Sequence, residues 1–257
     1  MEIFKRKKKS KQFVSSPAFG KTLHKNLDFT ATEQYKLIRA NLEYIVQEDD
    51  KCPVIGITSS MRGEGKSTTA INLAYVIAEK GSKVLLIDAD LRIPSIAKKL
   101  DIDSSSGLTD LLKGKGAKIS EFQTHLLPNW YVLPSGPIPP NPSELLGSKR
   151  MENVLAQLKE VFDYVIIDLP PVNVVSDAIS ISSLISGMIV VVREDFTEKK
   201  ELERCFRQLN LANAKVIGCV LNSSKPESRS YYGKYKKYKY YSYGYGYYQS
   251  RPEGEKK

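Results

Sequence analysis

Short apolar runs alternate with stretches of helical periodicity through the middle of the chain. The runs are apolar at nearly every position, which is typical of strands buried on both faces of a parallel sheet. They predict strands at 54–58, 83–88, 130–133, 164–168, 188–193 and 216–221. A helix is expected from about Lys66 to Glu79, ended by Gly81. The pattern predicts an α/β fold with a mostly parallel sheet flanked by helices.

A further helix is expected ahead of the first strand. Thr30 and Glu33 have the Thr-x-x-Glu spacing of a capping box, which begins a helix. Apolar residues recur behind them at helical spacing and form the expected buried stripe, namely Tyr35, Ile38, Leu42 and Ile45. Glu33, Lys36 and Arg39 lie off that stripe, and we expect them on the exposed face.

A proline-rich stretch separates two of the predicted elements. Residues 135–142 contain four prolines and predict a loop. Ser143 follows and is expected to be the N-cap of the next helix.

Basic residues are concentrated at the two ends of the chain. Residues 1–28 contain eight Lys or Arg against two acidic residues, and 225–257 contain nine against three. The formal net charge is +10, which leaves −2 for residues 29–224. A nucleic-acid binder usually carries its basic patch on the folded domain, so no nucleic-acid partner is expected. The ends are either arms near an acidic surface, such as a membrane leaflet, or merely solvated tails.

The last part of the chain changes character completely. It interleaves tyrosines with Lys, Gly and Ser, without the aliphatic residues that a core requires. We therefore expect a disordered basic arm at 1–28, one folded domain at 29–224 and a flexible tail at 225–257. The ten tyrosines of the tail are Tyr231, Tyr232, Tyr235, Tyr238, Tyr240, Tyr241, Tyr243, Tyr245, Tyr247 and Tyr248.

Cysteine usage and hydropathy favour a cytoplasmic protein. Cys52, Cys205 and Cys219 are odd in number and form no CxxC pair, which suits a reducing compartment and disfavours a zinc site. No apolar segment follows the basic start as it would in a signal peptide. The most apolar stretch, 178–192, is shorter than the ~18–20 residues of a spanning helix. Any membrane association is expected to be peripheral or through a partner.

A phosphate-binding loop is predicted between the first strand and the helix behind it. Residues Gly63, Glu64, Gly65, Lys66, Ser67 and Thr68 stand in the strand–loop–helix context that a P-loop requires. The glycines let N–H groups wrap a phosphate, Lys66 reaches the β- and γ-phosphates of ATP, and Ser67 binds Mg²⁺. The strict pattern has glycine at position 60, where this chain has Ser60. The sequence thus predicts a P-loop NTPase that uses ATP and Mg²⁺.

Acidic residues end two of the predicted strands. Asp88 and Asp90 follow the second strand, and Asp168 ends the fourth. Ligands of open α/β sheets bind beyond the carboxyl ends of the strands. We therefore expect these aspartates to converge with the P-loop.

Three motifs and the tail together resemble the bacterial tyrosine kinases. Residues 58–68 resemble the Walker A motif of that family, 85–92 its Walker A′ motif and 165–171 its Walker B motif. The tyrosine cluster resembles the tail on which the family autophosphorylates. The resemblance spans roughly residues 30–248. It departs at Arg62, where the family commonly has proline.

The resemblance implies roles for the predicted site residues. Asp88 would accept the proton of the incoming tyrosine, and Lys66 would hold the phosphates. Asp90 and Asp168 would hold Mg²⁺, directly or through water. Asn222 would hydrogen-bond adenine, or would simply be a turn residue after the last strand.

The resemblance also implies assembly and partners. Family members transfer phosphate between the subunits of a ring, whose E-x-x-R-x-x-R contact motif corresponds here to Glu33, Lys36 and Arg39, with Lys for the first Arg. Members without a membrane segment are cytoplasmic and are recruited and activated by a transmembrane protein of the polysaccharide co-polymerase type. They serve capsule or exopolysaccharide synthesis, and a cognate tyrosine phosphatase would reverse the reaction.

Two other functions remain open. An ATPase switch of the ParA/MinD type shares the fold, but it has a lysine early in the P-loop, where this chain has Met61. A MinD-like chain would also end in a membrane helix containing Leu and Ile, which this tail lacks. The other alternative is a nonenzymatic scaffold whose tyrosine-rich tail self-associates. The presence of Lys66, Asp88 and Asp168 favours an enzyme.

Overall fold

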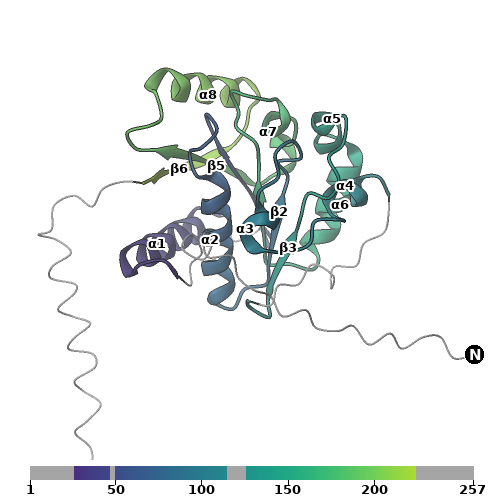
Figure 1. The fold of residues 1–257 in the computed structure, drawn as a ribbon, viewed down its shortest axis with the longest axis horizontal. Helices are drawn as coiled ribbons and strands as arrows, with labels where there is room; N and C mark the ends of the chain where they lie inside the picture. The colour runs from purple at the N-terminus through teal and green to yellow at the C-terminus, as the bar shows by residue number, and fades with distance from the viewer. Residues whose placement is uncertain (1–25, 47–49, 115–125, 224–257) are drawn as a thin grey trace, which may run out of the picture. The chain divides into compact units, whose positions relative to one another are not determined.

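A parallel six-stranded sheet forms the centre of the computed structural model, which describes residues 26–46, 50–114 and 126–223 (Figure 1). The strand order is β3-β2-β4-β1-β5-β6, and every neighbouring pair is parallel. The predicted fold class and all six predicted strands are confirmed, with bounds that differ by no more than one residue. The strands are β1 (Val54–Ser59), β2 (Val84–Asp88), β3 (Trp130–Leu133), β4 (Tyr164–Asp168), β5 (Gly187–Arg193) and β6 (Val216–Asn222).

Helices cover both faces of the sheet, and the alternation of side chains divides the core between them. On β2, for example, Leu86 faces the layer that contains α1 (Phe29–Ile45) and α2 (Lys66–Glu79), whereas Leu85 faces the other layer. The second layer contains α6 (Lys149–Lys159) and α8 (Lys199–Leu211). Shorter helices complete the fold: α3 (Ile96–Leu100), α4 (Leu108–Leu112), α5 (Pro142–Leu146), α7 (Asp177–Ser180) and η3 (Ser182–Leu184).

The register of the strands places the predicted acidic residues at one level. Asp88 pairs with Asp168 between β2 and β4, and Asp168 pairs with Ile57 between β4 and β1. Because the strands are parallel, the loop that follows β1 lies at the same edge of the sheet. The predicted convergence of the aspartates with the P-loop is therefore confirmed at the level of the backbone.

The start of α1 differs from the prediction. Its N-cap is Asp28, whose Oδ1 accepts a hydrogen bond of 2.8 Å from the backbone N–H of Ala31, so the Thr30 capping box was wrong. The predicted stripe is correct in the middle of the helix, where Leu42 is buried and Tyr35 and Ile38 pack against the core. It fails at the end, because Ile45 is 45% exposed.

Arg39 does not lie on an exposed face of α1, as its position off the stripe had predicted. Its side chain is 19% exposed, and its Nη1 donates a hydrogen bond of 2.7 Å to the backbone carbonyl of Val76 in α2. Glu33 and Lys36 form an ion pair with each other at 3.0 Å and are about 40% exposed. Arg39 therefore ties α1 to α2 within the domain, whereas Glu33 and Lys36 remain accessible.

The helix after the proline-rich loop also begins differently from the prediction. Pro142 is its first residue and Asn141 is its N-cap, so Ser143 is not the cap. The Ser143 hydroxyl instead donates a hydrogen bond of 2.6 Å to Asp177 Oδ1. A capping serine and a serine with a distant partner cannot be told apart from local sequence.

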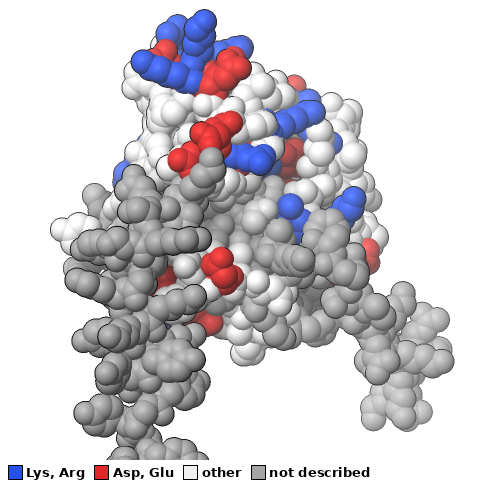
Figure 2. Space-filling view, turned by 60° about the vertical axis from the view of Figure 1, so that its left-hand side comes forward, with Lys and Arg blue, Asp and Glu red and all other residues white. Residues whose placement is uncertain are grey.

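The surface of the described residues carries charges of both signs. Figure 2 shows Lys and Arg gathered with acidic residues at the upper end of the molecule, where Figure 1 places α8. The exposed basic residues of that helix are Lys199, Lys200, Arg204 and Arg207. Within 26–46, 50–114 and 126–223, no helix is long and apolar enough to cross a membrane. The predictions for the arm up to residue 25 and for the tail tyrosines lie outside the described residues.

Candidate active site

The loop between β1 and α2 has the backbone conformation of a phosphate-binding loop. Gly63 and Gly65 have φ angles of +85° and +97°, which L side chains rarely adopt. Helix α2 begins at Lys66, so the N–H groups of its first turn are free of intrahelical partners and attract an anion. The departure at position 60 is explained, because the buried Ser60 hydroxyl donates a hydrogen bond of 2.7 Å to Glu64 within the loop.

Lys66 lies between two of the predicted aspartates and contacts Ser67 beside it on α2. Its Nζ lies 2.9 Å from Asp90 Oδ2, 3.2 Å from Asp168 Oδ1 and 3.3 Å from Ser67 Oγ, and its side chain is 12% exposed. Burial lowers the pKa of Lys66, but the negative charges of Asp168 and Asp90 outweigh that effect and raise its pKa overall. Lys66 is therefore a charged ammonium group held between two carboxylates.

Asp88 has the environment of a general base. It is fully buried, and burial, together with the charge of Asp168, raises its pKa to about 7. The backbone N–H groups of Ser95 and Ile96 donate hydrogen bonds of 3.0 Å to its Oδ2 and oppose the shift. Its Oδ1 is buried without a hydrogen-bond partner among the described residues. One carboxylate oxygen is thus anchored while the other is left for a ligand.

The acidic residues fit a magnesium ion that is held mainly by a nucleotide. Asp168 is fully buried, and burial raises its pKa, with Lys66 opposing. Its Oδ2, like Asp88 Oδ1, has no hydrogen-bond partner in the described structure. Across the described ranges, no three His, Cys, Asp or Glu side chains form a metal cage by themselves. Mg²⁺ needs no such cage, because it usually takes one or two carboxylates plus phosphate oxygens and water.

Asn222 lies beside the P-loop and contacts its backbone. Its Nδ2 donates a hydrogen bond of 2.9 Å to the carbonyl of Glu64. A Cβ atom at position 65 would come within 2.1 Å of the same nitrogen, so this contact also requires Gly65. The contact gives Asn222 a part in shaping the loop, which the sequence had not predicted. Its predicted contact with adenine stays a prediction.

Two further groups support the site and were missed by sequence reasoning. Arg92 binds Asp177 with two hydrogen bonds, of 2.9 Å from Nε and 3.0 Å from Nη2. Asp177 is fully buried on α7, so this pair fixes the segment behind Asp90 to the second helical layer. The other group consists of Arg193 and Thr197, which contact the P-loop from the end of β5 and from the segment between β5 and α8. Only the Walker A′ resemblance drew attention to Arg92, and no local signal marked its partner.

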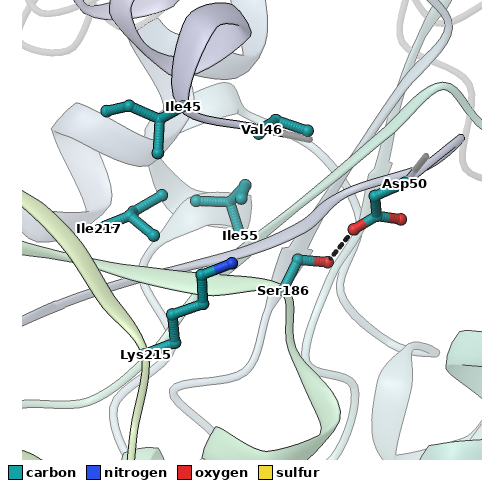
Figure 3. Close-up of a pocket in the computed structure, with 7 residues that line it drawn as sticks. All are labelled: Ile45, Val46, Asp50, Ile55, Ser186, Lys215 and Ile217. Carbon is teal, nitrogen blue, oxygen red and sulfur yellow. Dashed lines mark hydrogen bonds between the residues drawn. The ribbon is translucent and has the colours of Figure 1, made fainter. Parts of the chain in front are cut away.

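A separate small pocket lies near the amino ends of the strands, at the opposite end from the candidate active site (Figure 3). Ile45, Ile55 and Ile217 line it, and Lys215 extends toward it. The Ser186 hydroxyl donates a hydrogen bond of 2.6 Å to Asp50 at its rim. Ile55 lies near the amino end of β1, whereas the aspartates lie at carboxyl ends. This pocket is therefore distinct from the candidate active site.

Comparison with known proteins agrees with the geometry of the site. Residues 52–215 match the family described as an AAA domain. The chain is 40% identical over 204 residues to the tyrosine-protein kinase YwqD of Bacillus subtilis. The aligned region covers 79% of this chain and 86% of that protein.

Solved structures distinguish between the kinase and the ATPase switch. The kinase domain of the Escherichia coli tyrosine kinase ETK superposes with a TM-score of 0.74 and 28% identity, covering 87% of this chain and 88% of that one. The septum site-determining protein MinD from Pyrococcus horikoshii, solved with Mg-ADP, gives a TM-score of 0.56 and 26% identity, covering 69% of this chain and 73% of that one. The kinase is thus more similar in both coverage and structure. This chain belongs to the family of bacterial tyrosine-protein kinases, built on a P-loop AAA domain.

Proposed function

We propose that this chain is an ATP- and Mg²⁺-dependent protein-tyrosine kinase, which converts ATP and a protein tyrosine into ADP and phosphotyrosine. The observation that carries the proposal is the group of charges at the carboxyl edge of the sheet. The ammonium group of Lys66 is buried between Asp90 and Asp168. The neighbouring strand β2 ends in Asp88, whose pKa is about 7. Phosphoryl transfer needs this kind of positioning and charge neutralisation more than covalent chemistry.

The residues divide the work as follows. The loop Gly63–Thr68 binds the phosphates through its N–H groups, and Lys66 places a positive charge on them. Ser67, Asp90 and Asp168 would hold Mg²⁺, which neutralises phosphate charge when bound. Asp88 accepts the proton of the tyrosine hydroxyl, whose pKa is ordinarily ~10. A base with a pKa near the working pH is well matched to this task, because it is deprotonated and still strong enough to take a proton.

The acceptor we propose is the chain's own tail. The ten tyrosines at 231–248 are interleaved with lysine, glycine and serine. By analogy with the family, transfer occurs between subunits of a homo-oligomeric ring whose contact motif is Glu33, Lys36 and Arg39. Glu33 and Lys36 are the accessible members of that motif. A tyrosine phosphatase would return the tail to its starting state.

The cellular role we propose is control of capsular or exopolysaccharide synthesis at the inner face of the cell membrane. A transmembrane activator of the polysaccharide co-polymerase type would recruit the cytoplasmic kinase. The basic residues of 1–28 support this location, because each contributes about 1 kcal/mol near an anionic leaflet.

The test uses purified chain, γ-labelled ATP and Mg²⁺. We expect label on tail tyrosines, increased strongly by the cytoplasmic segment of the activator. Asp88→Asn should abolish the labelling while nucleotide binding persists. Release of phosphate without labelling would establish an ATPase switch instead. Absence of both reactions, with the activator present, would leave the scaffold.

A further inference from the structure

Glu64 is an acidic residue inside a loop that binds polyphosphate, yet its side chain is fully buried. Its carboxylate accepts three hydrogen bonds. Two come from the loop itself, from the Ser60 hydroxyl at 2.7 Å and the Met61 N–H at 2.8 Å. The third comes from the hydroxyl of Thr197, which lies between β5 and α8 and is distant in sequence. The carboxylate therefore closes the loop on itself and fastens it to another element.

The end of β5 and the segment that follows it also hold the backbone of the loop at Gly63. Arg193 at the end of β5 donates a hydrogen bond of 3.1 Å to the carbonyl of Gly63. Its guanidinium stacks 5.0 Å from the ring centre of Phe196, and that ring lies against Gly63. Together with Asn222, these residues fix the carbonyls of Gly63 and Glu64 on the β5–β6 side.

This arrangement has a consequence for anion binding. A phosphate-binding loop must point its N–H groups inward, so its carbonyls point away and need donors of their own. Arg193 and Asn222 supply those donors. Glu64 supplies the remaining restraint, because it anchors the turn at 60–61 from which the loop departs. The bonds from Arg193, Thr197 and Asn222 all come from β5, β6 or the segment between β5 and α8, whereas those from Ser60 and Met61 stay within the loop.

We propose that Thr197 is a positioning residue for the nucleotide, and that it acts through the Glu64 carboxylate on the shape of the P-loop. Thr197 also fixes its own segment, since its hydroxyl accepts a hydrogen bond of 2.9 Å from the Arg193 N–H. One hydroxyl thus joins the residue that holds Gly63 to the carboxylate that closes the loop. The inference rests on the proposed nucleotide site and adds a residue outside the three Walker motifs.

The variant that tests this is Thr197→Val, which replaces the hydroxyl by a methyl group of similar size. Glu64 then stays buried with one donor fewer, and its carboxylate loses its tie to the segment between β5 and α8. Losing a hydrogen bond to a charged group corresponds to roughly a 10-fold rise in the Kd for a fluorescent ADP analogue. Thr197→Ser keeps the hydroxyl and is expected to bind within about twofold of the unaltered chain. In the kinase assay, the KM for ATP should rise much more than kcat falls.

A second pair of variants separates positioning from general damage to the fold. In a Glu64→Gln background the charged acceptor is already gone, so Thr197→Val should weaken nucleotide binding by less than about threefold. Equal effects in both backgrounds, equal losses in Thr197→Val and Thr197→Ser, or an unchanged Kd would each overturn the inference. A fall in the thermal stability of Thr197→Val large enough to account for its loss of affinity would also count against the inference, because it would indicate damage to the fold. Failure of the unaltered chain to bind ADP would instead refute the proposed function.

Discussion

At the scale of the single residue, Lys66 also stabilises the fold. Its ammonium group neutralises the carboxylates of Asp90 and Asp168. Lys66→Met removes that cation and leaves two buried carboxylates together. Breaking a buried pair costs about 3–5 kcal/mol, so the thermal midpoint in EDTA should fall by roughly 10 °C. Adding Mg²⁺ should raise the midpoint more in the variant than in the unaltered chain, since the ion takes the place of the ammonium.

Scanning calorimetry with and without Mg²⁺ measures this effect. Lys80→Met is the matched control, because Lys80 pairs with Glu43 at 2.7 Å on an exposed surface. That variant should change the midpoint little. A Lys66→Met chain as stable as the control in EDTA would show that the carboxylates do not depend on the ammonium. The phosphoryl-transfer rate of Lys66→Met should fall by ~10²–10³ or more in any case.

Asp88 is a site where function opposes stability. Its folded pKa of about 7 lies above the ordinary value of 3.8 for an aspartate, so the native state holds a proton more tightly than the unfolded chain. The resulting destabilisation is complete above about pH 7 and vanishes as the pH falls toward 4. Asp88→Asn removes the charge and keeps an acceptor for the Ser95 and Ile96 N–H groups. It should stabilise the protein at pH 8 by up to about 4 kcal/mol.

Thermal melts in EDTA at several pH values test this assignment. The stability gap between Asp88→Asn and the unaltered chain should narrow steadily between pH 7 and pH 4. A gap that stays constant with pH, or an Asn variant that is less stable at pH 8, would contradict the raised pKa of Asp88.

Single residues also show where sequence reasoning stops. Lys66, Ser67 and the three aspartates lie close together as expected, because the apolar pattern locates the strand ends that bring them together. Arg39 was misplaced because its partner, Val76, is 37 positions away. A helical wheel describes one helix, and it cannot show that a second helix packs over the polar side chain.

At the scale of elements, the Arg92–Asp177 pair connects the β2 end to α7. Arg92→Lys loses the two-pronged contact, and the buried Asp177 keeps only the Ser143 hydroxyl and a point charge. We expect a loss of about 2 kcal/mol in stability. The transfer rate should fall by roughly 10-fold, because Asp90 lies two residues before Arg92 and small displacements are costly in a reacting site.

The measurements are urea unfolding and initial rates of tail phosphorylation. Lys149→Ala provides the control, since Lys149 pairs with Glu152 at an exposed position on α6. It should leave both quantities unchanged. If Arg92→Lys lowered stability but left the rate intact, the pair would hold α7 without positioning Asp90.

The elements were more predictable than their ends. The strands were located to within a residue because each is an apolar run. Burial on both faces accounts for the runs of β1 and β2, whereas β6 at the edge of the sheet is half-buried or exposed along its length. The caps of α1 and α5 were wrong because Thr30 and Ser143 satisfy the local rule as well as Asp28 and Asn141 do. The choice between such candidates is made by distant partners, as the bond from Ser143 to Asp177 shows.

At the scale of the whole molecule, a substitution at an accessible residue of α1 tests the predicted ring more cleanly than a substitution of Arg39. Arg39→Ala would also remove the bond to Val76 and weaken the domain. Glu33 and Lys36 form an ion pair with each other and are partly exposed. Glu33→Lys should therefore abolish a ring contact while leaving the thermal midpoint nearly unchanged.

The opposite change should strengthen the assembly. Lys36→Arg restores the planar, two-pronged donor that the family motif has at this position and should pair more strongly with a carboxylate of the neighbouring subunit. Each phosphate on the tail adds about −1.5 to −2 charges, so heavily phosphorylated tails around one ring repel each other. Light scattering should show a large oligomer for the unphosphorylated chain, a more persistent one for Lys36→Arg, and monomers for Glu33→Lys and for phosphorylated protein. One mass for all four samples would refute both the α1 contact and the charge switch, whereas loss of the oligomer on phosphorylation alone would refute only the contact.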